Sequence, residues 1–194
     1  AEITTTYIID TRTGKTLYPP LENTFGFQWT KDQQHAYITI RSKEDIAKQL
    51  PLKTFHIKIG DPLEKATLAG TTTDAQNSFY IYDNRYSDVS FSGESDFYSN
   101  NCYMRKTGSS EKGQLIYESK KSAAYPEAIG DKLYIFTNDN APNYRLLVAD
   151  KKNPEYKNWK QLVPEGKTVL QTYVVTKKNI IIQDKLDIQS RLTL

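Results

Sequence analysis

The sequence predicts an all-β fold made of repeated antiparallel sheets. Apolar and polar residues alternate with a period of two in many short stretches, among them residues 25–29, 133–135 and 144–148. The 14 Tyr and 7 Phe suit half-buried strands, which pack on one face and meet water on the other. The strand pattern also repeats, because Tyr37, Tyr86, Tyr134 and Ile180 align at intervals of roughly 46 to 49 residues. A repeat of this length with about four strands is typical of propeller blades, so the sequence predicts a partial β-propeller of about four blades.

In chain order, each predicted element follows from this repeat. Residues 1–24 are expected to hold the last strands of one blade, including a strand at residues 7–9 and a turn at residues 10–15. One short helix is expected between strands, because Ser42 can cap its start, Asp45 lies three residues later and Pro51 ends it. The expected full blades are residues 25–70, 76–119 and 122–166, and residues 168–194 form part of a further blade.

Composition excludes several classes of protein. The 26 basic and 23 acidic residues are spread along the chain, so no basic face for nucleic acid is expected. Cys102 is the only cysteine, which excludes an intrachain disulfide and a cysteine-based metal site. No apolar run is long enough for a membrane helix, and no signal-peptide pattern is present. Because an export signal could have been removed, its absence decides little; we expect a cytoplasmic protein, and a periplasmic one if a signal peptide was removed.

The residues needed for catalysis are not found together in the sequence. A serine hydrolase usually presents its nucleophile in Gly-x-Ser-x-Gly, and the turns around Ser95 and Ser110 lack the second glycine. His35 and His56 lie in strand patterns with no evident orienting acid or third metal ligand. The acidic residues Asp83 to Asp96 lack the order of a calcium loop. No catalytic residue, metal site or cofactor is expected.

Residues 134–150 form the most informative stretch, two strands around a polar turn. Asn138 and Asn143 tolerate left-handed backbone and bond to neighbouring main chain, while Pro142 fixes one φ angle. Arg145 offers five donors, which could fix this turn or pair with an acid in the next blade. Turn chemistry alone explains these residue types, so a structural corner and a binding site both remain open.

With Ile129–Lys132 before it and Trp159–Glu165 behind it, this stretch closely resembles the β-propeller domain of the prolyl oligopeptidase family of serine peptidases. That family includes prolyl endopeptidase and oligopeptidase B (protease II). Residues 10–15, 29–37 and 55–62 are also similar to turns and strands of the family. The resemblance assigns a structural motif to Thr137, Asn138, Pro142, Asn143, Tyr144, Arg145 and Trp159.

The resemblance implies a fragment of a seven-bladed propeller that caps an α/β-hydrolase domain of the same polypeptide and admits only short peptides. The Ser-His-Asp triad of the family lies in that hydrolase domain, and nothing in residues 1–194 corresponds to it, so this chain alone should be inactive. Asp139 stands where prolyl endopeptidases often have an arginine that faces the substrate cavity. This difference leaves prolyl specificity and a preference for basic residues both open.

Two alternatives to a peptidase fragment remain. One is a stand-alone β-propeller or sandwich that binds a protein or a glycan, and the other is a metal-dependent hydrolase, which the two histidines disfavour. A partial propeller would also expose strand edges, through which copies of the chain could associate.

Overall fold

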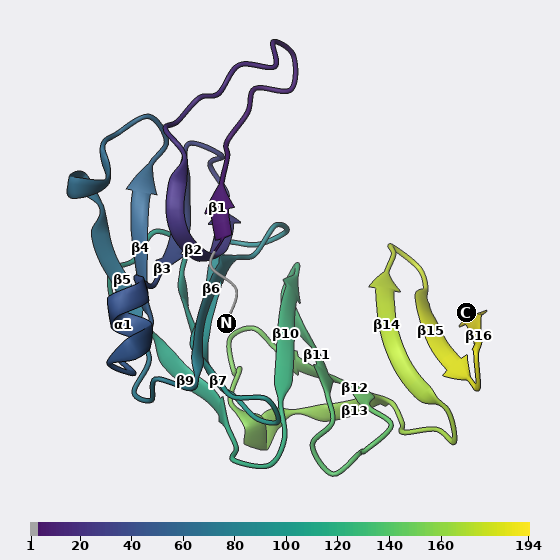
Figure 1. Ribbon diagram of the computed structural model, residues 1–194. Coiled ribbons are helices and arrows are strands. Elements are labelled where there is room, and N and C mark those ends of the chain that lie inside the picture. Colours follow the sequence, from purple (N-terminus) through teal and green to yellow (C-terminus); the bar gives the residue numbers. More distant parts are fainter. Residues whose placement is uncertain (1–3) are drawn as a thin grey trace. The chain divides into compact units, whose positions relative to one another are not determined.

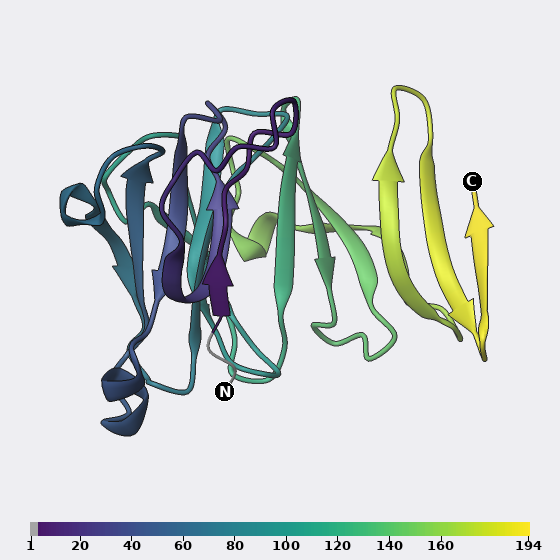
Figure 2. The same ribbon diagram turned by 45° about the horizontal axis from the view of Figure 1, so that its top comes forward.

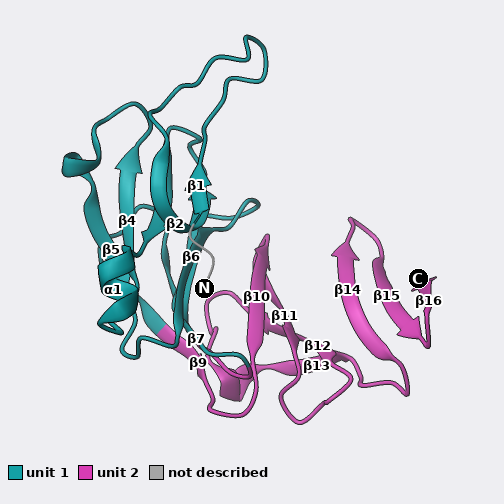
Figure 3. Ribbon diagram, in the orientation of Figure 1, with its two compact units in different colours: residues 1–97, 103–114 teal, residues 98–102, 115–194 magenta. Residues whose placement is uncertain are grey.

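The computed structural model describes residues 4–194 and consists almost entirely of antiparallel strands (Figures 1 and 2). The strands form four sheets, and within each sheet every strand pairs with its neighbours in sequence. The chain divides into two compact units, residues 1–97 with 103–114 and residues 98–102 with 115–194 (Figure 3). The prediction of an all-β fold is confirmed.

The first sheet has five strands, and its core lies on one face. Leu21, Ala36, Ile38 and Ile57 from the strands pack with Ile8 and Tyr18 from the segment between β1 and β2, all of them buried. The alternation seen in the sequence produces this face, because successive side chains of a strand point to opposite sides. The strands, in their order across the sheet, are β1 (Thr4–Thr6), β2 (Leu21–Trp29), β3 (His35–Ile40), β4 (Lys53–Lys58) and β5 (Thr67–Thr71), with the 3-10 helix η1 (Leu63–Lys65) before β5.

The prediction of a strand at residues 7–9 is wrong, whereas the prediction of a turn at residues 10–15 is confirmed. The strand lies earlier, at β1, and Ile9 forms only an isolated bridge with Thr16. The hairpin between β1 and β2 projects from the sheet in Figure 1. At its tip the Gly14 N–H donates to the Asp10 carbonyl at 2.8 Å, with Gly14 in the left-handed region at φ 67°. Glycine suits this position because it has no Cβ to clash.

The short helix α1 (Lys43–Ala47) lies between β3 and β4, as the sequence predicts (Figure 1). The Ser42 Oγ accepts from the Asp45 N–H at 3.0 Å, and the Asp45 carboxylate accepts from the Ser42 N–H at 3.0 Å. This reciprocal capping satisfies main-chain donors that a helix start leaves unpaired.

The second sheet corrects one position of the predicted repeat. Tyr86 lies outside the strands, in the tight turn that the Asn84 N–H closes by donating to the Val89 carbonyl at 2.9 Å. The third residue of the second sheet's central strand is instead Phe91, which corresponds to Tyr37 in β3 and Tyr134 in β11. Spacing alone could not separate a turn tyrosine from a strand tyrosine. The strands, in order, are β6 (Ser78–Asp83), β7 (Val89–Ser95), β8 (Asn101–Lys106) and β9 (Gln114–Glu118).

The third sheet holds the largest group of fully buried side chains in the second unit, including Ala128, Leu133, Ile135 and Leu146. Its strands, in order, are β10 (Ala124–Ile129), β11 (Lys132–Thr137), β12 (Arg145–Asp150) and β13 (Lys160–Val163), with the 3-10 helix η2 (Tyr156–Asn158) before β13.

The fourth sheet follows in the same unit. Its Tyr173 hydroxyl donates to the Tyr134 carbonyl and to the Glu127 carboxylate, both at 3.4 Å. These contacts fasten the first strand of the fourth sheet to the third sheet. The strands, in order, are β14 (Val169–Val175), β15 (Ile180–Leu186) and β16 (Gln189–Thr193).

Among the described residues, the helices are all too short and too polar to cross a bilayer. The expected limits of the individual blades stay a prediction, and the sheets have between three and five strands.

Candidate functional site

The turn between β11 and β12 is anchored to the start of β10. The Thr137 hydroxyl, fully buried at the end of β11, donates to the Ala123 carbonyl at 2.7 Å. The Asn138 side-chain oxygen accepts from the Ala123 N–H, also at 2.7 Å. Both polar groups of Ala123 are therefore satisfied by the turn, which explains why a threonine and an asparagine stand here.

Two residues of this turn adopt left-handed backbone, and neither is Asn138 or Asn143. Asn140 has φ 47° and Tyr144 has φ 65°, whereas Asn138 and Asn143 do not have positive φ. The Tyr144 ring stacks on Phe136 of β11 with centroids 4.6 Å apart. This stacking offsets part of the cost of a left-handed backbone in a bulky residue.

Asn143 fastens the turn to the segment that leads into β14. Its N–H donates to the Glu165 carboxylate at 2.7 Å, and its side-chain amide donates to the Gly166 carbonyl at 3.1 Å. Its carbonyl accepts from the Leu170 N–H at 2.8 Å. Pro142 is exposed. The turn thus connects the start of β10 with the start of β14.

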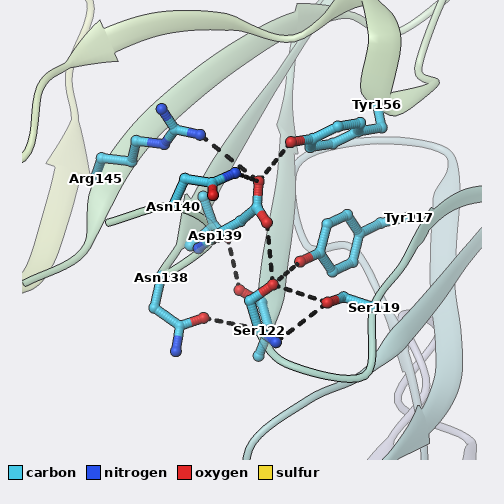
Figure 4. A network of polar contacts seen from close by, with 10 residues as sticks. Tyr117, Ser119, Ser122, Asn138, Asp139, Asn140, Arg145 and Tyr156 are labelled. Carbon is cyan, nitrogen blue, oxygen red and sulfur yellow. Dashed lines mark hydrogen bonds and ion pairs between the residues drawn. The ribbon is translucent and has the colours of Figure 1, made fainter. Parts of the chain in front are cut away.

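Asp139 is the centre of a polar network in the second unit (Figure 4). One carboxylate oxygen accepts from the Ser122 hydroxyl at 3.1 Å, and the other accepts from the Tyr156 hydroxyl. The Arg145 guanidinium lies 3.7 Å from the same carboxylate, which retains 15% side-chain exposure. The hydrogen bond to Asp139, followed by burial, raises the pKa of Tyr156, because an ionised phenol could no longer donate to the carboxylate.

Ser122 extends this network to two aromatic side chains. Its hydroxyl bonds to the Tyr117 hydroxyl at 2.7 Å and to the Ser119 hydroxyl at 2.9 Å. The Tyr117 ring stacks on Trp159 at 5.4 Å, and the Trp159 indole N–H donates to the Pro154 carbonyl at 2.7 Å. The polar turn and Trp159, which are separate in sequence, therefore belong to one connected cluster.

Four members of this cluster are not predicted from the sequence: Tyr117, Ser119, Ser122 and Tyr156. Nothing in their local pattern distinguishes them from ordinary turn and strand residues. Arg145 pairs with Asp139 in its own turn, which is one of the two arrangements that the sequence left open. Its Nε is buried without a hydrogen-bond partner among the described residues.

The contacts of Asp139 suit a structural role better than a catalytic one. Both histidines of the chain, His35 and His56, lie in the first unit, so no imidazole belongs to the cluster around Ser122. A serine nucleophile needs a general base within hydrogen-bond reach. The carboxylate of Asp139 accepts hydrogen bonds from neutral hydroxyls and holds three segments of chain together.

His35 has an acid partner that its strand pattern does not reveal. The His35 Nδ1 lies 2.7 Å from the Asp32 carboxylate, and the His35 and His56 rings stack with centroids 5.0 Å apart. The pKa of Asp32 lies well below its usual range, and the hydrogen bond from the Thr30 hydroxyl is the largest cause. In the described part of the chain, no hydroxyl or thiol is bonded to either imidazole, so the acid–base pair has no nucleophile.

No group of three or more metal-ligating side chains converges anywhere in residues 4–194. Cys102 is buried and forms no disulfide. Ser95 lies at the end of β7, opposite Ser78 in β6, and Ser110 lies in the turn after β8. A role of Asp139 in facing substrate stays a prediction.

A model of the prolyl oligopeptidase N-terminal β-propeller domain matches residues 1–194. No curated protein matches the chain. Among solved structures, one of two prolyl endopeptidases studied for inter-domain dynamics is similar, with TM-score 0.82 and 19% identity, over 96% of this chain and 29% of that chain. Oligopeptidase B from Leishmania major gives TM-score 0.75 and 15% identity, over 98% of this chain and 27% of that one.

Prolyl oligopeptidase B from Galerina marginata, without ligand, gives TM-score 0.73 and 14% identity, over 96% of this chain and 28% of that chain. At these identities the likeness shows the fold alone. The prediction of a partial β-propeller is confirmed, and the chain spans less than a third of the length of these solved structures.

Proposed function

Because the chain belongs to the prolyl oligopeptidase family, as its N-terminal β-propeller domain, we propose that it restricts the access of short peptides to a hydrolase domain. In this proposal residues 1–194 are the non-catalytic part of a serine-type endopeptidase. The α/β-hydrolase domain belongs to the same parent polypeptide and performs the chemistry. The chain by itself is inactive.

The match to the family model over the whole chain carries this proposal. The contacts in the chain agree with it, since the described serines and histidines form no nucleophile–base pair. Tight sheets with buried, hydrogen-bonded connections suit a rigid steric barrier. They offer no pair of groups suited to peptide hydrolysis.

Two measurements test the proposal. The purified chain, incubated with chromogenic peptides that carry Pro or Arg before the leaving group, should give no turnover. Inhibitor-sensitive hydrolysis by the chain would refute the non-catalytic role. In the parent polypeptide, kcat/KM should fall steeply as unstructured substrates are lengthened, and equal rates for short and long substrates would refute restricted access.

We also propose that Asp139 contacts substrate in the parent polypeptide, through the part of its carboxylate that remains exposed. In this role its charge favours basic residues over proline. Asp139→Asn in the parent polypeptide should then raise KM for peptides with Arg before the scissile bond and leave kcat nearly unchanged. An unchanged KM would leave the residue with a structural role only.

A stand-alone binding module for a protein or a glycan is the second candidate, and the open cavities of the first unit favour it. A reading frame that continues into Gly-x-Ser-x-Gly supports the peptidase, whereas a stop soon after Leu194 supports the module.

We further propose that β16, a fully exposed strand at one end of the fourth sheet, pairs with a second copy of the chain. Sedimentation of a monodisperse monomer at high concentration would argue against this pairing. We place the parent polypeptide in the cytoplasm, which cell fractionation would test.

A further inference from the structure

A cavity of about 810 Å³ lies in the first unit, between the turn that follows β2 and the turn that follows β6. The cavity is open to solvent and large enough for a small organic molecule or the end of a peptide. Neither turn belongs to the cluster around Asp139, which lies in the second unit. The residues that line the cavity are Gln28, Trp29, Thr30, Lys31, Asp83 and Arg85, together with Gln33.

Two contacts hold the turns together and give the cavity a fixed rim. The Lys31 N–H donates to the Asp83 carboxylate at 2.9 Å, and the Lys31 ammonium donates to the Ser87 carbonyl. Within the second turn the Tyr86 N–H donates to the Asn84 side chain at 2.9 Å. The two turns that carry the lining residues are therefore held in place before a ligand enters, which lowers the entropy cost of binding.

The charges that line the cavity favour an anion. Lys31 and Arg85 carry two positive charges against the single negative charge of Asp83. The Asp83 carboxylate is occupied, because it also accepts from the Ser90 hydroxyl at 2.7 Å and the Tyr37 hydroxyl at 3.5 Å. The Arg85 guanidinium is exposed, and its only contact recorded in residues 4–194 is with the Tyr86 ring, at 5.9 Å. Arg85 is thus the cation left to receive a ligand.

An aromatic surface lies beside these charges. Trp29 is 41% exposed, and Phe27 holds its ring edge-on with centroids 5.2 Å apart. A second cavity of about 420 Å³ shares Gln28 and Asp83 with the first. Phe27 of β2 and Phe79, Tyr80 and Tyr82 of β6 are among the residues that line this second cavity. A ligand with an apolar side chain next to an anionic group would match both surfaces.

We propose that this cavity binds the C-terminal end of a short peptide, with its terminal carboxylate paired to Arg85 and its last side chain on Trp29. The planar guanidinium can bond both carboxylate oxygens at once. The amides of Gln28 and Gln33 can donate to and accept from the peptide main chain. The lining residues and their contacts support an anion site, whereas the choice of a peptide as the ligand rests on the proposed function.

The test uses the 194-residue chain and two N-acetylated tripeptides that end in phenylalanine, one with a free carboxylate and one with a C-terminal amide. Calorimetric titration should show the acid binding at least tenfold more tightly than the amide, because a charge-assisted pair with arginine would be lost. Arg85→Gln should abolish this difference, and Arg85→Lys should retain part of it. Arg12→Gln, at an exposed arginine in a distant turn of the same unit, should change nothing.

Equal binding of acid and amide would overturn the carboxylate assignment, and binding of neither would overturn the site. If inorganic phosphate competes at concentrations similar to that of the peptide acid, the site binds anions in general, and the assignment of a peptide would be overturned. A difference that survives Arg85→Gln would overturn the role of Arg85. These titrations contain no hydrolase domain, so their failure is distinguishable from a failure of restricted access in the parent polypeptide.

Discussion

The ring of Phe79 lies directly against the backbone of Gly70. A Cβ atom added to Gly70 would come within 2.1 Å of the Phe79 Cζ. Gly70 belongs to β5 of the first sheet and Phe79 to β6 of the second, so this contact joins two sheets of the first unit. Only a residue without a side chain permits the ring to approach so closely.

Gly70→Ala should lower the free energy of unfolding by about 1–3 kcal/mol, because the Phe79 ring must move to admit a methyl group. Gly26→Ala is the matched control, since its Cβ would have its nearest contact at 3.5 Å, with Thr39. Urea unfolding measures both variants. Phe79→Leu in the Gly70→Ala background should recover part of the loss, and strictly additive effects would contradict the contact.

Asn100→Ala should lower the free energy of unfolding by about 2–4 kcal/mol, because it leaves the buried N–H and carbonyl of Ala124 without their hydrogen bonds to this side chain. The Asn100 side chain accepts from the Ala124 N–H at 2.9 Å and donates to the Ala124 carbonyl at 2.8 Å. Hydrogen exchange at the Ala124 amide should accelerate in the variant. Asn179→Ala, at an exposed turn, serves as the control. Unchanged exchange at Ala124 would be incompatible with this role.

Asp139→Asn should lower the pKa of Tyr156 towards the ordinary tyrosine value. The charged acceptor raises this pKa in the native chain, and a neutral amide would not. Spectrophotometric titration of the phenols can follow the change. The difference between Asp139→Asn and the native chain should shrink in a Tyr156→Phe background, where only the effect of Asp139 on the pKa of Tyr117 remains. Asp131→Asn, at an exposed acid, should leave the titration unaltered.

Acidification should lower the free energy of unfolding of the first unit through protonation of His56. Burial and then the nearby His35 lower the pKa of His56 from 6.5. Between this lowered pKa and about 6.5 the folded chain binds fewer protons than the unfolded chain, so stability falls as the pH falls through this window. His56→Gln should flatten the fall, measured by urea unfolding from pH 7.5 to pH 5, a range set by the histidine titration. Parallel profiles for the two proteins would rule out His56 as the cause.

Local patterns were sufficient for the elements whose residues act on their immediate neighbours. Ser42 and Asp45 cap a helix because both partners lie within one turn, and Gly14 closes its hairpin for the same reason. Tyr86 was misplaced because its spacing fits the repeat although it lies in a turn. Asn143 would tolerate a left-handed conformation, yet Tyr144 adopts one, and the stacking of its ring on Phe136 offsets part of the cost.

The order of apolar and polar residues, the spacing of the strands and the motif from Thr137 to Arg145 determined the fold class and the family. These features are local, so they can be read along the chain. Only the tertiary structure decided that Asp139 meets Ser122 and Tyr156, that Asp32 orients His35, and that Arg85 shares a cavity with Trp29. Side chains far apart in sequence meet according to strand register and turn geometry, and many different partners would satisfy the same donors and acceptors.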